Sequence, residues 1–255
     1  MRDATLQPLP ATSLGVPGLQ RLDYTSSRDG LRDWALLRHP APGIHTWVIC
    51  LHGFNANANQ LFMRKDLKRL WLPRYLEHGF GILSPTLRGD AWMNPPAIDD
   101  LDALIDYLRS LGATSIILES GSMGATSALF YASARPHNIQ AVIARSAVHD
   151  LRAYRDFCRA HAPRHPLLQP IADSLDRAHA NAFPHLAPDA LRTLPILLAH
   201  GSDDPIMPVS FPRRLVGLLH NHPRLRYCEL PGGDHEAPLA LQSPNLLQLA
   251  LDFLL

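Results

Sequence analysis

Short apolar runs alternate along the chain with longer segments in which apolar residues recur at helical spacing. The short runs are typical of buried strands, and they cover residues 46–51, 80–83, 116–118, 141–144, 196–199 and 225–230. The longer segments predict helices over residues 59–75, 95–111, 125–131, 211–219 and 243–253. Strands that alternate with helices form a mainly parallel sheet covered by helices on both faces. The pattern therefore predicts a single α/β domain over residues 1–255, with about eight strands.

Two regions depart from this alternation. Residues 1–18 are punctuated by proline and glycine and predict an extended arm, and residues 19–26 and 34–38 predict an antiparallel pair joined by a turn at 28–30. Residues 150–192 are rich in Arg, His, Ala and Pro, with weak helical periodicity and no strand-like run. Because this last segment falls between two predicted strands, we expect it to be an insertion that forms a short cap over the top of the sheet.

Composition excludes several classes of function. The hydrophobic fraction of 46% and the charged fraction of 18% fit a soluble globular enzyme and not a disordered chain. The formal net charge of +1 gives no electrostatic reason to expect a nucleic-acid partner or an acidic membrane surface. Composition carries no signal for an oligomeric state.

The three cysteines are Cys50, Cys158 and Cys228, and they form no C-x-x-C motif. An odd number without metal-ligand spacing predicts reduced, buried thiols and no disulfide framework. The chain shows no apolar leader and no run long enough to span a membrane. A cytoplasmic protein is therefore the default expectation.

The segment Ser120-Gly121-Ser122-Met123-Gly124 lies between a predicted strand and a predicted helix. Strand, sharp turn and helix are the context of a nucleophile elbow, in which a serine at the tip of the turn holds its hydroxyl clear of the backbone. The positions two residues before and after the tip must be small, as Ser120 and Gly124 are. The pattern alone is also compatible with an ordinary Gly/Ser turn, because its first position is serine and not glycine.

Further polar residues follow other predicted strands, at the edge of the sheet where ligands bind in such folds. Four loops leave the carboxyl ends of strands: His52-Gly53-Phe54, the Ser122 turn, His200-Gly201-Ser202-Asp203-Asp204-Pro205 and Pro231-Gly232-Gly233-Asp234-His235. Together they place a hydroxyl, a carboxylate and an imidazole on one rim, in the chain order Ser, Asp, His.

These motifs, in this order, resemble the α/β-hydrolase fold family of serine hydrolases over roughly residues 20–255. Within that family the chain looks most like the carboxylesterase, dienelactone-hydrolase-like and prolyl-oligopeptidase-like branches. The resemblance implies that Ser122 is the nucleophile, that His235 is the general base, and that Asp204 orients the imidazole. It also implies an oxyanion hole made by the backbone N–H groups of Phe54 and Met123.

The chain departs from the family pattern at Ser120, which replaces the first glycine of the elbow, and at the doubled Asp203-Asp204. Alignment with the family motif HG-x-x-D-P-x-x-P selects Asp204 as the acid. Pro205 also biases Asp204 toward an extended backbone, which makes it the more constrained of the two carboxylates.

The expected activity is hydrolysis of a small-molecule carboxylic ester through an acyl-serine intermediate, without a metal or an organic cofactor. Trp92 and Met93 either line the acyl pocket or cover the sheet edge, and Phe157 and Phe183 are apolar candidates for substrate contact in the cap. A serine peptidase or amidase is the alternative enzyme, although the chain has no room for the propeller that gates oligopeptidases. A non-catalytic binding protein of the same fold is the alternative outside enzymes.

Overall fold

The computed structural model describes residues 1–10, 14–238 and 252, and the helix predicted over 243–253 falls almost wholly outside them. The described strands are β1 (Arg2–Pro8), β2 (Leu19–Thr25), β3 (Arg32–Arg38), β4 (Thr46–Leu51), β5 (Gly81–Pro85), β6 (Ser115–Gly121), β7 (Ala141–Arg145), β8 (Ile196–Gly201) and β9 (Leu225–Leu230). The described helices are α1 (Gln60–Met63), η1 (Leu67–Trp71), α2 (Leu72–Glu77), α3 (Pro95–Ser110), α4 (Met123–Ala134), η2 (Pro136–Asn138), α5 (Leu151–His161), η3 (Ala162–Arg164), α6 (Leu168–Ala178), α7 (Pro188–Leu191) and α8 (Ser210–Leu218).

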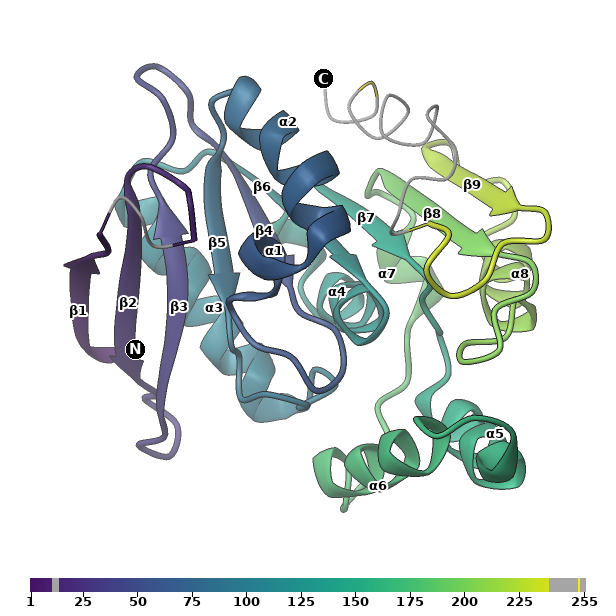
Figure 1. Ribbon diagram of the computed structural model, residues 1–255. Helices are drawn as coiled ribbons and strands as arrows, with labels where there is room; N and C mark the ends of the chain where they lie inside the picture. The colour runs from purple at the N-terminus through teal and green to yellow at the C-terminus, as the bar shows by residue number, and fades with distance from the viewer. Residues whose placement is uncertain (11–13, 239–251, 253–255) are drawn as a thin grey trace.

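All the described strands belong to one sheet, in the order β1-β2-β3-β5-β4-β6-β7-β8-β9. Strands β4 to β9 pair in parallel, as the strand–helix alternation predicts, and β1, β2 and β3 extend the sheet as antiparallel neighbours. The predicted mostly parallel α/β sheet is therefore present, with nine strands. The additional strand is β1, which lies in the segment expected to be an extended arm and pairs with β2 at the sheet edge (Figure 1).

Helices cover both faces of the sheet because its central strands bury side chains on both sides. In β4, Trp47 and Ile49 face the cluster that includes α3 and α4, while Val48 and Cys50 face the cluster that includes α1, η1 and α2. Figure 1 shows α1 and α2 in front of the sheet and α3 behind it. The continuous apolar runs of the sequence thus reflect strands buried on both faces.

The helix predicted over 59–75 is interrupted in the structure. Helix α1 ends at Met63, a π-helical turn follows at η1, and α2 begins with proline at its second position. Proline removes a backbone donor and clashes with the preceding turn inside a helix, so Pro73 is compatible with the first turn of α2 but not with one uninterrupted helix. The interruption matters for the site because α1 begins beside the loop that follows β4.

The segment 150–192 contains α5, η3, α6 and α7 and no strand, and it connects β7 to β8. Asp150 accepts a hydrogen bond from the backbone N–H of Ala153 and so caps α5. In α5, Leu151, Tyr154 and Cys158 are buried along one face. Figure 1 shows α5 and α6 packed side by side, away from the layers of the sheet and beyond the end of β7.

No helix among the described residues is long and apolar enough to cross a lipid bilayer. Cys50 and Cys158 are buried free thiols, as predicted, whereas Cys228 is only partly buried and corrects the expectation for that residue.

Candidate active site

Ser122 lies at the tip of a sharp turn between β6 and α4, with backbone angles φ 59° and ψ −127°. Positive φ in a non-glycine residue costs on the order of 1–3 kcal/mol and persists where the surrounding structure imposes it. Two backbone hydrogen bonds hold the turn: the Ser122 N–H donates to the carbonyl of Arg145 at 2.8 Å, and the Ser122 carbonyl accepts from Thr126 N–H at 3.0 Å. The strained geometry raises the hydroxyl away from both the strand and the helix.

The two small residues beside the tip pack against the end of β4. A Cβ atom at Gly124 would lie 2.3 Å from the carbonyl oxygen of Leu51, so no side chain fits there. The Ser120 hydroxyl accepts a hydrogen bond from Leu51 N–H at 3.0 Å and donates to the Glu119 carbonyl at 2.6 Å. Serine at this position therefore adds a link between the elbow and β4 that glycine could not make.

The structure brings Ser122, His235 and Asp204 together in one hydrogen-bonded chain. His235 Nε2 lies 3.0 Å from Ser122 Oγ, and His235 Nδ1 lies 2.7 Å from Asp204 Oδ2. Asp204 and His235 are both buried. With Nδ1 donating to the carboxylate, Nε2 carries a lone pair that can accept the serine proton.

Asp204, and not Asp203, is the carboxylate that faces His235. Its second oxygen, Oδ1, accepts hydrogen bonds from the backbone N–H groups of Ile206 at 2.9 Å and Met207 at 2.8 Å. Asp203 is exposed and accepts instead from the Ser202 hydroxyl at 2.8 Å. The carboxylate of Asp204 is thus fixed by the backbone before it contacts the imidazole.

His200 supports the same carboxylate and is a residue to which the sequence analysis gave no role. Its Nε2 donates to the Met207 carbonyl at 2.6 Å and lies 3.4 Å from Asp204 Oδ2. Burial alone would raise the pKa of Asp204, but hydrogen bonds from His200, His235 and the Met207 N–H outweigh burial and hold the pKa below its ordinary value. Asp204 is therefore ionised at neutral pH. The signal for His200 was its place in the same loop motif as Asp204.

Met123 follows Ser122 directly, and Gly53, the residue before Phe54, approaches the serine from the loop after β4. Met123 is the first residue of α4, where a backbone N–H has no partner within the helix. Phe54 follows Gly53, where an added Cβ would lie 3.8 Å from the Cβ of Ser122. Gln60, which sequence reasoning missed, accepts the Gly53 N–H through Oε1 at 2.7 Å and fixes this loop at the start of α1. His52 contacts the carbonyl oxygens of Gly53 and Thr86, each at 2.7 Å, and so holds the loop from the other side.

Trp92 and Met93 are buried and line a small apolar cavity together with Met123. Trp92 also contacts the inserted segment: its indole N–H donates to the Ser174 hydroxyl at 2.8 Å, and its carbonyl accepts from His179 Nε2 at 3.1 Å. Both residues have positive φ, 46° for Trp92 and 54° for Met93. Trp92 therefore links the cavity beside Met123 to the helices of the segment 150–192.

Phe157 and Phe183 lie in the segment 150–192 and line neither the cavity beside Ser122 nor the cavity beside Met123. Phe157 stacks on His161, with ring centroids 4.3 Å apart, and Phe183 lies under the guanidinium of Arg155. Phe183 also lines a groove of about 530 Å³ with His149 and other residues. In the same segment, Leu168 is buried and Leu167 is 40% exposed.

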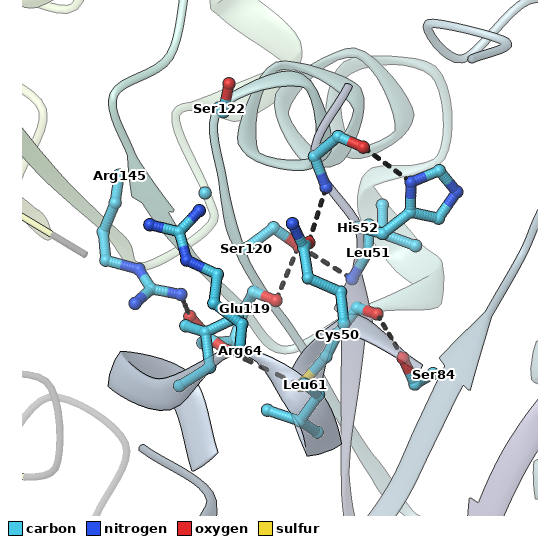
Figure 2. Close-up of a pocket in the computed structure, with 14 residues that line it drawn as sticks. Cys50, Leu51, His52, Leu61, Arg64, Ser84, Glu119, Ser120, Ser122 and Arg145 are labelled. Atoms are coloured by element: carbon cyan, nitrogen blue, oxygen red, sulfur yellow. Dashed lines mark hydrogen bonds and ion pairs between the residues drawn. The ribbon is translucent and has the colours of Figure 1, made fainter. Parts of the chain in front are cut away.

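An ion pair between Glu119 and Arg145 lies beneath the elbow and was also missed from the sequence. Both side chains are 2% exposed. The signal was available, because each charge stands at the end of an otherwise apolar run that forms a central strand. Figure 2 shows this pair with Arg64 below Ser122.

Among the described side chains, no group of three or more His, Cys, Asp or Glu residues is placed to hold a metal ion.

The sequence matches no protein-family model and no curated protein. The structure is similar to many solved ones. An esterase from Pyrococcus furiosus is 16% identical, with a TM-score of 0.70, over 97% of this chain and 94% of that one. The fluorophosphonate-binding serine hydrolase F of Staphylococcus aureus is 14% identical, with a TM-score of 0.71, over 93% and 98% of the two chains.

An α/β hydrolase from Novosphingobium aromaticivorans is 19% identical, with a TM-score of 0.62, and the match covers 93% of this chain and 98% of that one. These matches span nearly the whole length of both partners in each comparison. Together with the strand order and the parallel core, they show that this chain has the α/β-hydrolase fold.

Proposed function

We propose that this protein is a serine hydrolase that cleaves a small carboxylic ester through an acyl-serine intermediate. The observation that carries the proposal is the hydrogen-bonded chain from Ser122 through His235 to Asp204, with the serine held in a strained turn. A free serine hydroxyl is a weak nucleophile and needs a base within hydrogen-bond reach. The 3.0 Å contact to His235 Nε2 supports that role.

In the proposed reaction, Ser122 Oγ attacks the ester carbonyl while His235 takes the hydroxyl proton. Collapse of the tetrahedral intermediate breaks the bond to the alcohol, which leaves with the proton from His235. Water then attacks the acyl-serine, again with His235 as base, and releases the acid and the free serine. Asp204 keeps the imidazole in the required tautomer and stabilises the imidazolium.

The backbone N–H groups of Met123 and Phe54 are the proposed donors to the oxyanion. Met123 N–H is free of helical partners at the start of α4, where the helix dipole also favours negative charge. Gln60 and His52 hold the loop that carries Phe54. An oxyanion donor must be held in position before the reaction, so these contacts support the assignment of Phe54. Loss of one such donor typically costs about 10²–10³ in rate.

We infer that the segment 150–192 is a cap that selects substrates. It follows the carboxyl end of β7, and Trp92 joins it to the rim through Ser174 and His179. The apolar cavity lined by Trp92, Met93 and Met123 is a proposed acyl contact beside the nucleophile.

The test compares Ser122→Ala with Ser120→Ala on a panel of esters graded by acyl length, with peptide amides alongside. Ser122→Ala should keep the fold and lower kcat/KM for esters by several orders of magnitude. Ser120→Ala should lose far less, because it removes a support of the elbow and not the nucleophile. Ordinary ester hydrolysis by Ser122→Ala would overturn the proposal, and faster cleavage of amides than esters would replace the esterase with an amidase.

A further inference from the structure

The groove of about 530 Å³ that contains Phe183 lies where the segment 150–192 joins the sheet. One wall comes from the start of α5, a second from residues 183–186, which follow α6, and a third from α8. Figure 1 shows the two connections that run from the sheet to α5 and α6. Pockets for small molecules typically have volumes of about 300–1,000 Å³, so the groove is large enough to hold one.

Two arginines without an ion-pair partner line this groove. Arg152 belongs to α5 and Arg214 to α8, so they enter the groove from different elements. Both residues are exposed, and neither makes an ion pair or a hydrogen bond with another residue that the structure describes. The Arg152 guanidinium lies 5.7 Å from the ring centroid of Phe183. A ligand in the groove can therefore reach both side chains from solvent.

Other arginines on the same two helices are paired. On α5, Arg159 forms an ion pair with Asp176, and on α8, Arg213 forms one with Glu229. Neither Arg159 nor Arg213 lines the groove. The positive charges of Arg152 and Arg214 are thus left uncompensated on the sides of α5 and α8 that border the hollow.

The remaining polar groups of the lining do not cancel this charge. Asp150 is the acidic residue among them, and its Oδ1 accepts the hydrogen bond from Ala153 N–H that caps α5. Burial lowers the pKa of His149, and the positive charge of Arg214 acts in the same direction, so this imidazole is neutral at neutral pH. Two arginines against one aspartate give the groove an excess of positive charge.

The rest of the lining is largely apolar. Phe183 and Leu186 form part of it, together with Leu218, which is a large apolar side chain left 43% exposed. Arginine binds carboxylates through a planar fork of N–H donors, whereas apolar side chains favour the burial of an apolar group. The combination fits a ligand that has a carboxylate at one end and an apolar body.

We propose that this groove binds a small-molecule carboxylate with an apolar body. The carboxylate pairs with Arg152 and Arg214, and the body lies against Phe183 and Leu218. Among the described residues, the groove shares no lining residue with the cavities beside Ser122 and Met123. The inference therefore does not depend on the chemistry proposed at Ser122.

The first test compares three probes by isothermal titration calorimetry of the full-length protein at pH 7.5. The probes are 4-phenylbutanoate, its uncharged analogue 4-phenylbutanamide, and acetate, which has the charge without the apolar body. Low ionic strength is used because exposed charges are then least screened. 4-Phenylbutanoate should bind about tenfold more tightly than either of the other probes, because each exposed ion pair contributes a factor of about two to five. Equal affinity for the acid and the amide, or no measurable binding of the acid, would overturn the proposal.

The second test uses two double variants that remove the same amount of positive charge from the same two helices. Arg152→Met/Arg214→Met should abolish the preference for the acid over the amide, whereas Arg159→Met/Arg213→Met should keep it. All four positions are exposed, so both proteins should fold with melting temperatures near that of the wild type.

A preference for the acid that survives Arg152→Met/Arg214→Met would place the carboxylate elsewhere, for example beside Ser122, and would contradict the proposal. An equal loss of preference in both double variants would mean that the net charge of the protein, and not this groove, attracts the acid.

Discussion

The sheet rim that carries Ser122, His235 and Asp204 and the helices of the segment 150–192 are held in place by different kinds of contact. On the rim, Asp204 is fixed by two backbone N–H groups, and Ser122 is fixed by backbone bonds to Arg145 and Thr126. In the segment 150–192, α5 and α6 bury apolar side chains such as Tyr154 and Leu175 and are also joined by partly exposed ion pairs such as Arg155–Asp176 at 3.0 Å. Backbone hydrogen bonds leave the side chains of Asp204 and Ser122 little freedom to move. Ion pairs near the surface contribute at most about 1 kcal/mol each to stability.

The difference indicates where the proposed chemistry and the proposed selectivity lie. Proton transfer requires atoms held within a few tenths of an ångström, which the buried rim provides. A surface that discriminates between substrates tolerates replacement of its exposed side chains more readily, which suits the partly exposed Phe157 and Phe183. Changes on the rim should therefore abolish activity, and changes in the insertion should redirect it.

The largest effect on the rim, apart from that of Ser122→Ala, is expected for Asp204→Asn. The amide cannot hold the imidazole in the same tautomer, so kcat should fall by up to about 10⁴ while the fold persists. Asp203→Asn is the matched control and should cost much less, because Asp203 is exposed and bonds only locally. Steady-state kinetics on one activated ester compares the two variants. If Asp203→Asn were the one that lost activity, Asp203 and not Asp204 would be the acid that orients His235.

Gly124→Ala tests whether close packing of the elbow is needed. The new methyl group would lie 2.3 Å from the Leu51 carbonyl oxygen, so the elbow must shift, at a cost of about 1–3 kcal/mol in stability and with a large loss of kcat. Gly217→Ala is the control within α8, where an added Cβ meets nothing within 4 Å and should stabilise the helix slightly. Full activity and an unchanged melting temperature for Gly124→Ala would show that the elbow tolerates displacement.

In the insertion, Phe183→Ala should change selectivity more than stability. Phe183 is partly exposed and lines a groove, so its loss should alter the ratio of kcat/KM for short and long acyl esters by about tenfold or less. Phe157→Ala should act in the same way, whereas Leu168→Ala removes a buried side chain and should cost about 2–5 kcal/mol of stability. Equal losses on every ester for the phenylalanine variants, together with a large drop in melting temperature, would mean that the segment is core and not cap.

The smallest effect concerns the link between His179 and Trp92. Burial lowers the pKa of His179, so the folded state favours the neutral ring. Because the folded pKa lies below the unfolded value of about 6.5, this contribution to stability is present above that pH and is lost as the pH falls through the folded pKa. His179→Gln keeps a donor toward Trp92 without a titrating group.

The melting temperatures of the wild type and of His179→Gln should be compared at pH 7.5 and pH 5. The melting temperature of the wild type should fall further between pH 7.5 and pH 5 than that of the variant. His149 is also buried with a lowered pKa, so the variant should retain part of the pH dependence. If the melting temperatures of the two proteins fell equally, His179 would not contribute to the pH dependence of stability.

Much of the fold was predictable because the central strands are apolar on both faces and the helices keep their period. The arm at the N-terminus was not predicted as β1, because an edge strand such as Arg2–Pro8 has exposed side chains and no apolar run. The break between α1 and α2 has a local signal in Pro73, which the periodicity of apolar residues alone does not include. The first miss therefore concerns a strand whose conformation depends on pairing with β2, and the second concerns a residue type that the periodicity ignores.

In the site, the residues that follow strand ends could be found because parallel strands bring their carboxyl ends to one edge. The supporting residues Gln60 and His200 could not be assigned roles, since their contacts depend on the path of a neighbouring loop. Glu119 and Arg145 are adjacent only because β6 and β7 pair in register. Sequence reasoning thus identified the groups proposed to contact the substrate but not the residues that position them.

The most direct test of the central claim is covalent labelling with a fluorophosphonate probe, which reacts with an activated serine, followed by mass spectrometry of the digested protein. The account predicts one adduct, on the peptide that contains Ser122, much slower labelling of Asp204→Asn, and no adduct on Ser122→Ala. Labelling of a different residue, or no labelling of the folded wild-type protein, would contradict it.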